Sequence, residues 1–271
     1  MPELPEVETT RSGISPHIKN QTIKQIKVRN KNLRWPVPRG LSKILESKKI
    51  RTVKRRAKYL LLGTDVGTII IHLGMSGSLR IVREDTRAEK HDHVDIVFKN
   101  KKVLRLRDPR RFGSVLFTNK PPEEHKLLKN LGPEPLSEEF DGSYLFKLSR
   151  NRKVAVKNLI MNSKNVVGVG NIYASEALFL AGILPQKLSY KLTQAECKKL
   201  ASSIKRVLKA AIKAGGTSLR DFTRSDGMPG YFSLSLKVYD HKGEPCPKCG
   251  NLIKSKVIGQ RTTYFCTHCQ T

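Results

Sequence analysis

Cys246-Pro-Lys-Cys249 and Cys266-Thr-His-Cys269 decide how the last part of this chain folds. Four of its five cysteines lie in these two Cys-x2-Cys pairs, which sixteen residues separate. Zinc binds four thiolates in a tetrahedron, and two such pairs joined by a hairpin supply them. The alternatives are two disulfides or four unrelated cysteines. The spacing and the lack of a secretion signal favour one zinc ion, held by Cys246, Cys249, Cys266 and Cys269.

The segment around these cysteines, from about residue 236, is poor in apolar residues. A module of fewer than ~40 residues rarely folds by burial of apolar surface alone. A structural zinc ion can contribute roughly 10–16 kcal/mol in such peptides. Since protein ligands would fill all four positions, none is left for a reactive water. We therefore expect a zinc ribbon in which the metal is structural rather than catalytic.

The chain is strongly basic over its whole length. It has 52 Lys and Arg residues against 23 Asp and Glu, a formal net charge of +29 and a pI of about 10.2. Such a field attracts polyanions, and the spread of the basic residues indicates that much of the fold faces one. The alternatives are a generally basic proteome or an effect on solubility. We expect a nucleic acid partner whose binding weakens steeply with salt.

The sequence has no apolar stretch of the ~20 residues that a bilayer-spanning helix needs. Its start, Met1–Glu8, is acidic and lacks the basic and apolar regions of a signal peptide. We expect a cytoplasmic, nucleoid-associated protein without a membrane partner, and a monomer by default.

Two kinds of apolar spacing divide the chain. Residues 5–18 have the composition of a helix, with Pro5 and Glu6 suited to its first turn. From about 22 to 118, short β-branched and aromatic runs alternate with Gly, Asn, Asp and Pro. Such runs at regular spacing predict a β-sandwich or barrel. The runs lie at Ile26 and Val28, Val53, Tyr59–Leu62, Ile69–Leu73, Leu79–Val82, Val94–Phe98, Val103–Leu106 and Val115–Phe117.

Residues 119–143 are rich in proline, glycine and acids, which is typical of a linker between domains. After them the spacing becomes helical. Thr193-Gln-Ala-Glu196 predicts a capping box, and the apolar stripe behind it, which includes Cys197, ends at Gly215-Gly216. Two more helices are expected over Lys153–Asn162 and Ile172–Ala181.

Pro2 is the first candidate for chemistry. Its small size favours removal of Met1, which would leave a free secondary amine. An α-amino group has a pKa near 7.7–8, so much more of it is neutral at neutral pH than of a lysine with a pKa of ~10.4. A neutral amine can attack a sugar carbon and form an iminium, with Glu3 beside it to transfer a proton. The alternative is a Met-Pro start without functional meaning.

Three further groups each leave two interpretations open. Lys58, ahead of an apolar run, is a second amine near phosphates or part of a solvated basic face. His91 and His93 share one strand face without an evident third ligand, so a phosphate contact or plain exposure is expected rather than a metal. Asp108–Phe112 joins guanidinium groups to an aromatic ring, and it either fills a gap in a base stack or is a hairpin turn with a core phenylalanine.

Gly168-Val-Gly170-Asn171 lacks the third glycine and the preceding strand of a dinucleotide-binding loop. It predicts a tight turn that opens a helix at Asn171. Exposed amides at the start of a helix suit a phosphate.

Taken in order, these motifs resemble the formamidopyrimidine-DNA glycosylase family from residue 2 to residue 269. The resemblance depends on the ordered set rather than on any one motif. The matching segments are Pro2–Thr9, Arg56–Leu60, His72–Gly77, Asp108–Gly113, Val166–Tyr173, Ser225–Tyr231 and the four-cysteine finger with Gln260-Arg261.

The resemblance implies specific roles. Pro2 would be the nucleophile at the sugar C1′ and Glu3 the general acid, while Lys58 would assist elimination and Arg261 would hold a phosphate near the lesion. The residues that would fill the hole left by an extruded base are Met75, Arg110 and Phe112. Those that would contact the DNA backbone are His91, Lys157 and Asn171, with Arg152 and Lys153. Thr217–Tyr231 would cover the flipped base.

The implied function is that of a bifunctional DNA glycosylase and AP lyase of base excision repair. It would flip out and excise oxidised purines such as 8-oxoguanine and formamidopyrimidines from double-stranded DNA, and then nick abasic sites by β,δ-elimination. One alternative is a sister enzyme of the endonuclease VIII type, which acts on oxidised pyrimidines. Another is a non-catalytic zinc-ribbon DNA-binding protein. The family usually has an acid where this chain has Asn162, which leaves no carboxylate role there.

The expected fold class is α+β in two domains. We expect an N-terminal catalytic β-sandwich with a leading helix over residues 1–130 and a linker over 131–145. A helical domain with a helix–two-turn–helix unit would occupy residues 146–235, and the zinc-ribbon finger 236–271.

Overall fold

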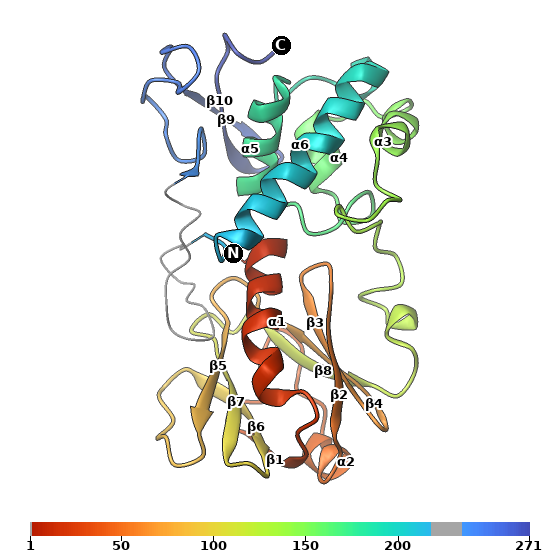
Figure 1. Ribbon diagram of the computed structural model, residues 1–271, viewed down its shortest axis with the longest axis vertical. Coiled ribbons are helices and arrows are strands. Elements are labelled where there is room, and N and C mark those ends of the chain that lie inside the picture. The colour runs from red at the N-terminus through yellow and green to blue at the C-terminus, as the bar shows by residue number, and fades with distance from the viewer. Residues whose placement is uncertain (1, 218–234) are drawn as a thin grey trace. The chain divides into compact units, whose positions relative to one another are not determined.

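The computed structural model of the chain describes residues 2–217 and 235–271 (Figure 1). These residues form two compact units, 2–130 with 214–217 and 131–213 with 235–271. The first holds two β-sheets and the second is mainly helical, so the α+β class is confirmed. In the part of the chain that is described, no helix combines the length and the apolar content needed to cross a bilayer.

The first unit is a β-sandwich with a leading helix. Its sheets have the orders β1-β6-β7-β5 and β2-β3-β4-β8, with antiparallel neighbours throughout. The elements are α1 (Leu4–Ile18), β1 (Ile23–Val28), α2 (Leu41–Leu45), β2 (Ile50–Arg56), β3 (Tyr59–Thr64), β4 (Gly67–His72), β5 (Ser78–Arg83), β6 (Asp92–Phe98), β7 (Lys102–Arg107), β8 (Ser114–Thr118) and the 3-10 turn η1 (Pro122–Glu124).

One apolar core holds α1 and both sheets together. Ile14 of α1, Ile96 of β6 and Leu60 of β3 belong to the same buried cluster, and each is at most 2% exposed. Every strand expected from the sequence is present, and so is the first helix. The short helix α2 was not foreseen, because its five residues are too few to show a helical period.

β6 is buried along its whole length although it contains charged residues. Asp95 accepts hydrogen bonds from Arg105 on β7 and from Arg29 after β1. This pairing lets a strand with two aspartates run through the sandwich, because a buried charge is tolerated when it is paired and hydrogen-bonded.

The second unit packs helices around α5 and α6 and ends in a two-stranded hairpin. Its elements are α3 (Gly142–Ser149), α4 (Val156–Met161), α5 (Asn171–Ala181), the 3-10 turn η2 (Ser189–Lys191), α6 (Gln194–Lys213), β9 (Lys254–Ile258) and β10 (Arg261–Phe265). The predicted capping box is confirmed, since Glu196 N donates to Thr193 Oγ1 and Thr193 N donates to Glu196 Oε2. Cys197 is fully buried, as expected.

Two helices differ from the expectation. α4 begins at Val156 rather than Lys153, and α3 begins at Gly142, inside the segment expected to be a linker. The Asp141 carboxylate caps α3 by accepting the N–H of Tyr144, so a proline-rich stretch can lead directly into a helix. The residue-level domain boundaries stay a prediction.

Candidate active site and nucleic-acid interface

A buried carboxylate holds the start of α1. Pro2 is buried, and Glu3 is the N-cap of the helix and only 3% exposed. Glu6 Oε2 accepts the N–H of Glu3 at 2.8 Å, while its Oε1 accepts the N–H and the hydroxyl of Thr217 at 2.8 and 3.0 Å. Gly216 (φ +83°) allows this approach, since a Cβ there would lie 3.0 Å from Glu6 Oε1. Glu6 therefore fixes the peptide that joins Pro2 to Glu3.

Lys58 lies in the two-residue turn between β2 and β3, where Ala57 has a left-handed backbone (φ 54°). Arg55 donates to the Ala57 carbonyl and also pairs with Glu8 of α1, both at 2.9 Å. Arg55 thus ties the turn that carries Lys58 to the helix that Pro2 and Glu3 begin. The sequence expectation that Lys58 precedes an apolar strand is confirmed.

His72 ends β4 beside this turn and is held as a neutral base. Its ring lies 4.8 Å from the ring of Tyr59, and its Nδ1 accepts the N–H of Gly74 at 3.0 Å. Burial, and then the positive charges of Lys58 and Arg34, lower the pKa of His72 from 6.5 to about 4. The Gly74 hydrogen bond places the ring proton on Nε2.

This pKa makes the first unit less stable in mild acid. Between pH 6.5 and about 4 the unfolded chain protonates His72 and the folded chain does not. The free energy of unfolding therefore falls as the pH falls through this window, by about 3 kcal/mol in total. Trp35, the single tryptophan, lies in the first unit and reports its urea unfolding. We expect His72→Gln to flatten the fall between about pH 7 and about pH 5; equal slopes in both proteins would contradict the assignment.

Asp108 organises the loop that follows β7. It is fully buried and accepts the Ser76 hydroxyl and the Gly113 N–H, each at 2.7 Å. Ser76 Oγ in turn accepts the N–H of Arg110 at 3.2 Å. The loops 73–77 and 108–113 are therefore joined through one carboxylate.

This joining leaves an aromatic ring exposed, while Met75 in the facing loop is partly buried. A Cβ on Gly74 would lie 2.4 Å from the backbone of Phe112, so the two loops touch through their main chains. Phe112 is 42% exposed, and the Arg110 guanidinium lies 5.1 Å from the centroid of its ring. The alternative of an ordinary turn with a core phenylalanine is wrong, because the Asp108 hydrogen bonds hold the loop with this ring on the surface.

His91 and His93 flank the same loop. The backbone carbonyl of His91 accepts the N–H of Asp108 at 3.0 Å. Nε2 of the buried His93 ring lies 2.8 Å from the carbonyl oxygen of Asp108. The two rings are 6.5 Å apart, and His91 is partly exposed. Within the described residues, no metal-ligand group of three or more includes either histidine.

Asn171 and Arg261 come together in the second unit. Asn171 is the first residue of α5, as expected, and its Nδ2 donates to the Thr262 carbonyl at 2.9 Å. Arg261 opens β10 directly after the turn Gly259-Gln260, whose residues both have positive φ (57° and 62°). A two-residue turn of this kind fixes the strand register, so Arg261 has a defined place next to α5.

The expected backbone contacts differ in exposure. Arg152 and Lys153 are exposed between α3 and α4, where the Arg152 carbonyl accepts the N–H of Tyr190. Lys157 has no exposed surface, and its ammonium donates to Asn171 Oδ1 and Thr263 Oγ1. This differs from the expected phosphate contact, because the Lys157 ammonium is directed at two protein oxygens. Of the loop expected over Thr217–Tyr231, residues 218–231 lie outside the described part of the chain.

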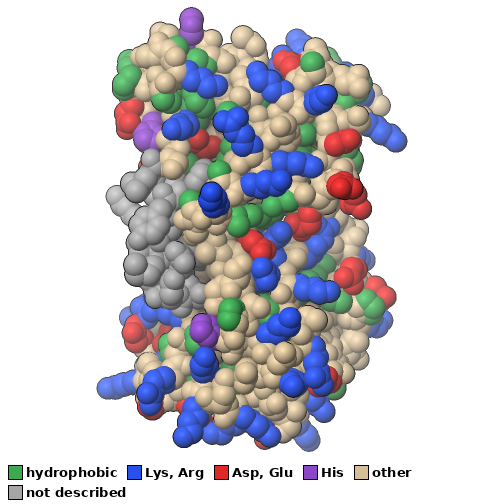
Figure 2. Space-filling view, viewed as in Figure 1, with side chains coloured by type: hydrophobic (Ala, Val, Ile, Leu, Met, Phe, Trp, Pro, Cys, Tyr) green, Lys and Arg blue, Asp and Glu red, His purple; other side chains and the backbone are tan. Residues whose placement is uncertain are grey.

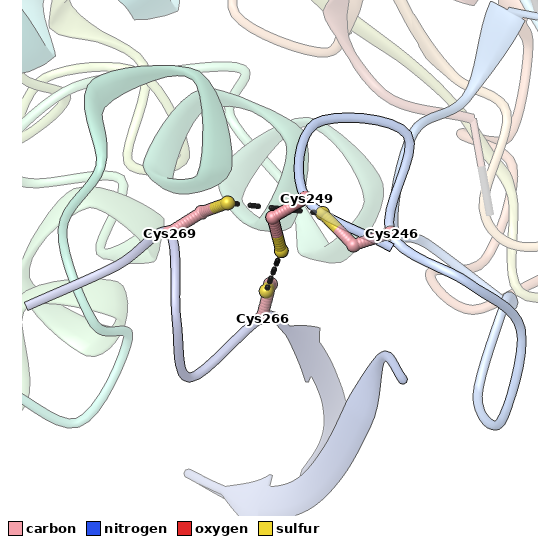
Figure 3. A group of neighbouring side chains, drawn as sticks. All are labelled: Cys246, Cys249, Cys266 and Cys269. Atoms are coloured by element: carbon pink, nitrogen blue, oxygen red, sulfur yellow. Dashed lines mark hydrogen bonds between the residues drawn. The ribbon is translucent and has the colours of Figure 1, made fainter. Parts of the chain in front are cut away.

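The four cysteines form one metal site (Figure 3). Their sulfur atoms all lie within 4.8 Å of one another, with Cys246 to Cys269 at 3.8 Å and Cys249 to Cys266 at 3.6 Å. A tetrahedral zinc site with bonds of about 2.3 Å has sulfur edges of about 3.8 Å, so zinc fits. N–H groups of Lys248 and Asn251 donate to Cys246 and Cys249, which supports thiolates. The prediction of one structural zinc ion is confirmed, and both disulfides are excluded.

Comparison with known proteins agrees with this architecture. Residues 1–115 match the formamidopyrimidine-DNA glycosylase N-terminal domain, 131–223 the H2TH domain of the same enzymes, and 243–271 a zinc finger found in FPG and IleRS. A formamidopyrimidine-DNA glycosylase from Alteromonas mediterranea is 56% identical over all 271 residues, with both chains fully covered. The chain belongs to the formamidopyrimidine-DNA glycosylase family.

Solved structures of this family extend the comparison. A Lactococcus lactis FPG mutant, in complex with DNA containing Fapy-dG, has a TM-score of 0.92 and 34% identity, with both chains covered completely. The wild-type Lactococcus lactis protein in complex with DNA containing an oxidised pyrimidine has a TM-score of 0.91 at 34% identity, again with full coverage. The family resemblance stated from the sequence is confirmed.

Sequence reasoning missed three side chains that shape the site, namely Glu6, His72 and Asp108. Each was inside a recognised motif, but Glu6 and Asp108 also have a partner in a distant segment, which the motif does not indicate. The partner of Glu6 is 211 residues away, and that of Asp108 is 32 residues away. The burial of these ionisable side chains would have pointed to their roles, but a sequence does not show which residues are buried.

Proposed function

We propose that this chain, as a DNA glycosylase of base excision repair, excises oxidised purines through the amine of Pro2 and then cuts the abasic strand. The observation that carries the proposal is the Pro2-Glu3 start of α1, buried and held by Glu6, in a chain of this family. A target base inside a duplex is out of reach, so it has to be extruded first.

The reaction begins at the Pro2 nitrogen. Its lone pair forms a bond to C1′ while the bond from C1′ to the base breaks, and the base leaves with that electron pair and takes up a proton. Ring opening, with Glu3 as the acid at the sugar oxygen, gives an iminium. Loss of a C2′ proton then expels the 3′ phosphate, a second elimination expels the 5′ phosphate, and water releases the amine. No step uses the zinc ion, which holds the ribbon.

Basic side chains would grip the strand around this point. Arg261 is proposed to hold a phosphate near the lesion and Lys58 to assist elimination. His91 and Asn171 are proposed to contact the DNA backbone, with Arg152 and Lys153. On the face that Figure 2 shows, Lys and Arg side chains are scattered over both units rather than gathered in one spot, which supports a sequence-independent electrostatic grip. The Fapy-dG complex of the Lactococcus lactis mutant supports an oxidised purine as the substrate.

Met75, Arg110 and Phe112 are proposed to fill the gap that the extruded base leaves. Phe112→Ala removes a ring that is 42% exposed, so we expect the unfolding of the first unit to change little. Stacking on an aromatic ring contributes about 1–3 kcal/mol per base, so the single-turnover excision rate at subsaturating enzyme should fall roughly 10- to 100-fold. Single-turnover excision and urea unfolding, measured together, separate the two effects. A large loss of stability with normal excision would show a core role instead.

The substrate class is tested with paired duplexes, one with 8-oxoguanine opposite cytosine and one with thymine glycol. We expect faster excision of 8-oxoguanine. The sister activity on oxidised pyrimidines is the second candidate, because a Lactococcus lactis neighbour was solved with an oxidised pyrimidine in its DNA. Faster excision of thymine glycol would support that candidate and overturn ours.

A non-catalytic DNA-binding role makes a different prediction. It gives tight binding to lesion DNA, but no covalent complex when borohydride is added. A trapped complex of the full chain excludes it. A cytoplasmic location near the nucleoid and a monomeric state complete the proposal, and imaging of a fluorescent fusion and sedimentation test them.

A further inference from the structure

A buried lysine joins three elements of the second unit. Lys157, on α4, is 0% exposed, and its Nζ donates to Asn171 Oδ1 at the start of α5 and to Thr263 Oγ1 on β10. Thr263 is also 0% exposed. One ammonium thus connects the helix before the Gly168–Asn171 turn, the helix after it and the zinc-ribbon hairpin.

The bonds continue from this ammonium to the backbone of Arg261. The Thr263 hydroxyl donates to the Arg261 carbonyl at 3.1 Å, and Asn171 Nδ2 donates to the Thr262 carbonyl at 2.9 Å. A hydroxyl can accept one hydrogen bond while it donates another, so Thr263 transmits the position of Lys157 to Arg261. The main chain of residues 261–263 is therefore held against α4 and α5.

The hairpin turn docks on the same helix. Gly259 lies so close to α4 that a Cβ on it would come within 2.3 Å of Asn158 Oδ1. Asn158 directly follows Lys157, so α4 holds the hairpin both at its tip and along β10. The backbone at Arg261 is therefore held in place, and only its side chain is free to change conformation.

We propose that Lys157 is a positioning residue, which acts on the reaction through Arg261 by holding the hairpin in place rather than by binding a phosphate itself. The inference rests on the proposed function of Arg261. Placing a phosphate group within a fraction of an ångström matters for the rate, because reacting groups misplaced by about 1 Å can lose roughly 100-fold.

The ribbon keeps a second anchor that does not involve Lys157. The Glu176 carboxylate on α5 accepts the N–H groups of Lys237, Val238 and Tyr239, each at 2.9 Å. Replacement of Lys157 should therefore loosen the hairpin without detaching the ribbon, and zinc content should stay at one ion per chain.

The test is a double-mutant cycle of Lys157→Met and Arg261→Ala in the zinc-loaded full chain. The readout is single-turnover cleavage of an abasic-site duplex at saturating enzyme. We expect each single variant to be roughly 100-fold slower and the double variant to be no slower than Arg261→Ala, because residues in one chain of contacts are not additive. The control is Lys256→Met, the same change at the exposed ladder partner of Thr263, which should stay within about twofold. A double variant whose rate loss equals the product of the two single losses would show that Lys157 contacts a phosphate directly, and it would overturn the inference.

A second pair keeps the test valid if Lys157→Met fails to hold zinc. Thr263→Val removes the hydroxyl that links Lys157 to Arg261, and Thr263→Ser keeps it. We expect cleavage to slow roughly tenfold in Thr263→Val and about twofold or less in Thr263→Ser. Equal rates in the two variants would overturn the inference. If wild type itself neither cleaves nor traps, the proposed function has failed; if wild type cleaves and these variants match it, only this inference has failed.

Discussion

We expect covalent trapping and strand cleavage by this chain to be lost when the nitrogen at position 2 is kept inside an amide. A Pro2→Leu variant keeps Met1, because the initiator is removed only before a small residue, and its nitrogen at position 2 then stays in a peptide bond. An amide nitrogen shares its lone pair with the carbonyl and is a poor nucleophile. We expect the borohydride-trapped complex with 8-oxoguanine DNA to fall by roughly 1000-fold or more.

Pro2→Gly is the matched control. Glycine is small enough for Met1 to be removed, and it restores a free α-amine without the ring, so trapping should be measurable again. Position 2 is buried, so binding to an uncleavable abasic analogue shows whether the larger leucine disturbs α1. An intact-mass measurement shows whether Met1 has been removed from each protein. Full trapping by a Pro2→Leu chain that retains Met1 would place the nucleophile elsewhere, with Lys58 the next residue to change.

Removing one zinc ligand eliminates DNA cleavage while the first unit stays folded. Cys266 is fully buried among the apolar residues of the ribbon, and Cys266→Ala leaves three ligands for the metal. Structural zinc contributes about 10–16 kcal/mol to such modules, far more than the ribbon can replace by burial. We expect zinc per chain to fall from one to near zero and cleavage to fall at least ~100-fold, because Arg261 loses its place.

Cys197→Ala is the control for this variant, since it removes the fifth cysteine, which lies buried in α6 and outside the metal site. Its zinc content should match that of wild type. Trp35 fluorescence should give the same urea midpoint in all three proteins, because the tryptophan lies in the other unit. Normal cleavage by a zinc-free Cys266→Ala chain would mean that the ribbon is dispensable.

Much of the fold was predictable because its signals are local. β-branched runs such as Ile69–Leu73 predict strands from residues that neighbour one another along the chain. Thr193 and Glu196 close a capping box within one helical turn. The helix α3 escaped prediction because the prolines and acids of the residues before it are typical of a linker, and its eight residues show little apolar spacing.

The candidate site was predictable as a set of residues, but not as an arrangement. The motif Asp108–Phe112 left two interpretations open, and the Asp108 hydrogen bonds to Ser76 and Gly113 decided for a surface ring. Lys157 looked like a phosphate ligand, and the structure buries it instead.

By itself the sequence determined the family, most of the strand and helix pattern and the zinc ligands, and it named the candidate reactive residues, since these follow from spacing and side-chain chemistry along the chain. The tertiary structure alone decided which of those residues face outward and which hold others in place. Glu6 with Thr217, and Lys157 with Thr263, are pairs separated by 211 and 106 residues. The physical reason is that a buried polar group has to find a hydrogen-bond partner, and only the folded chain brings that partner within reach.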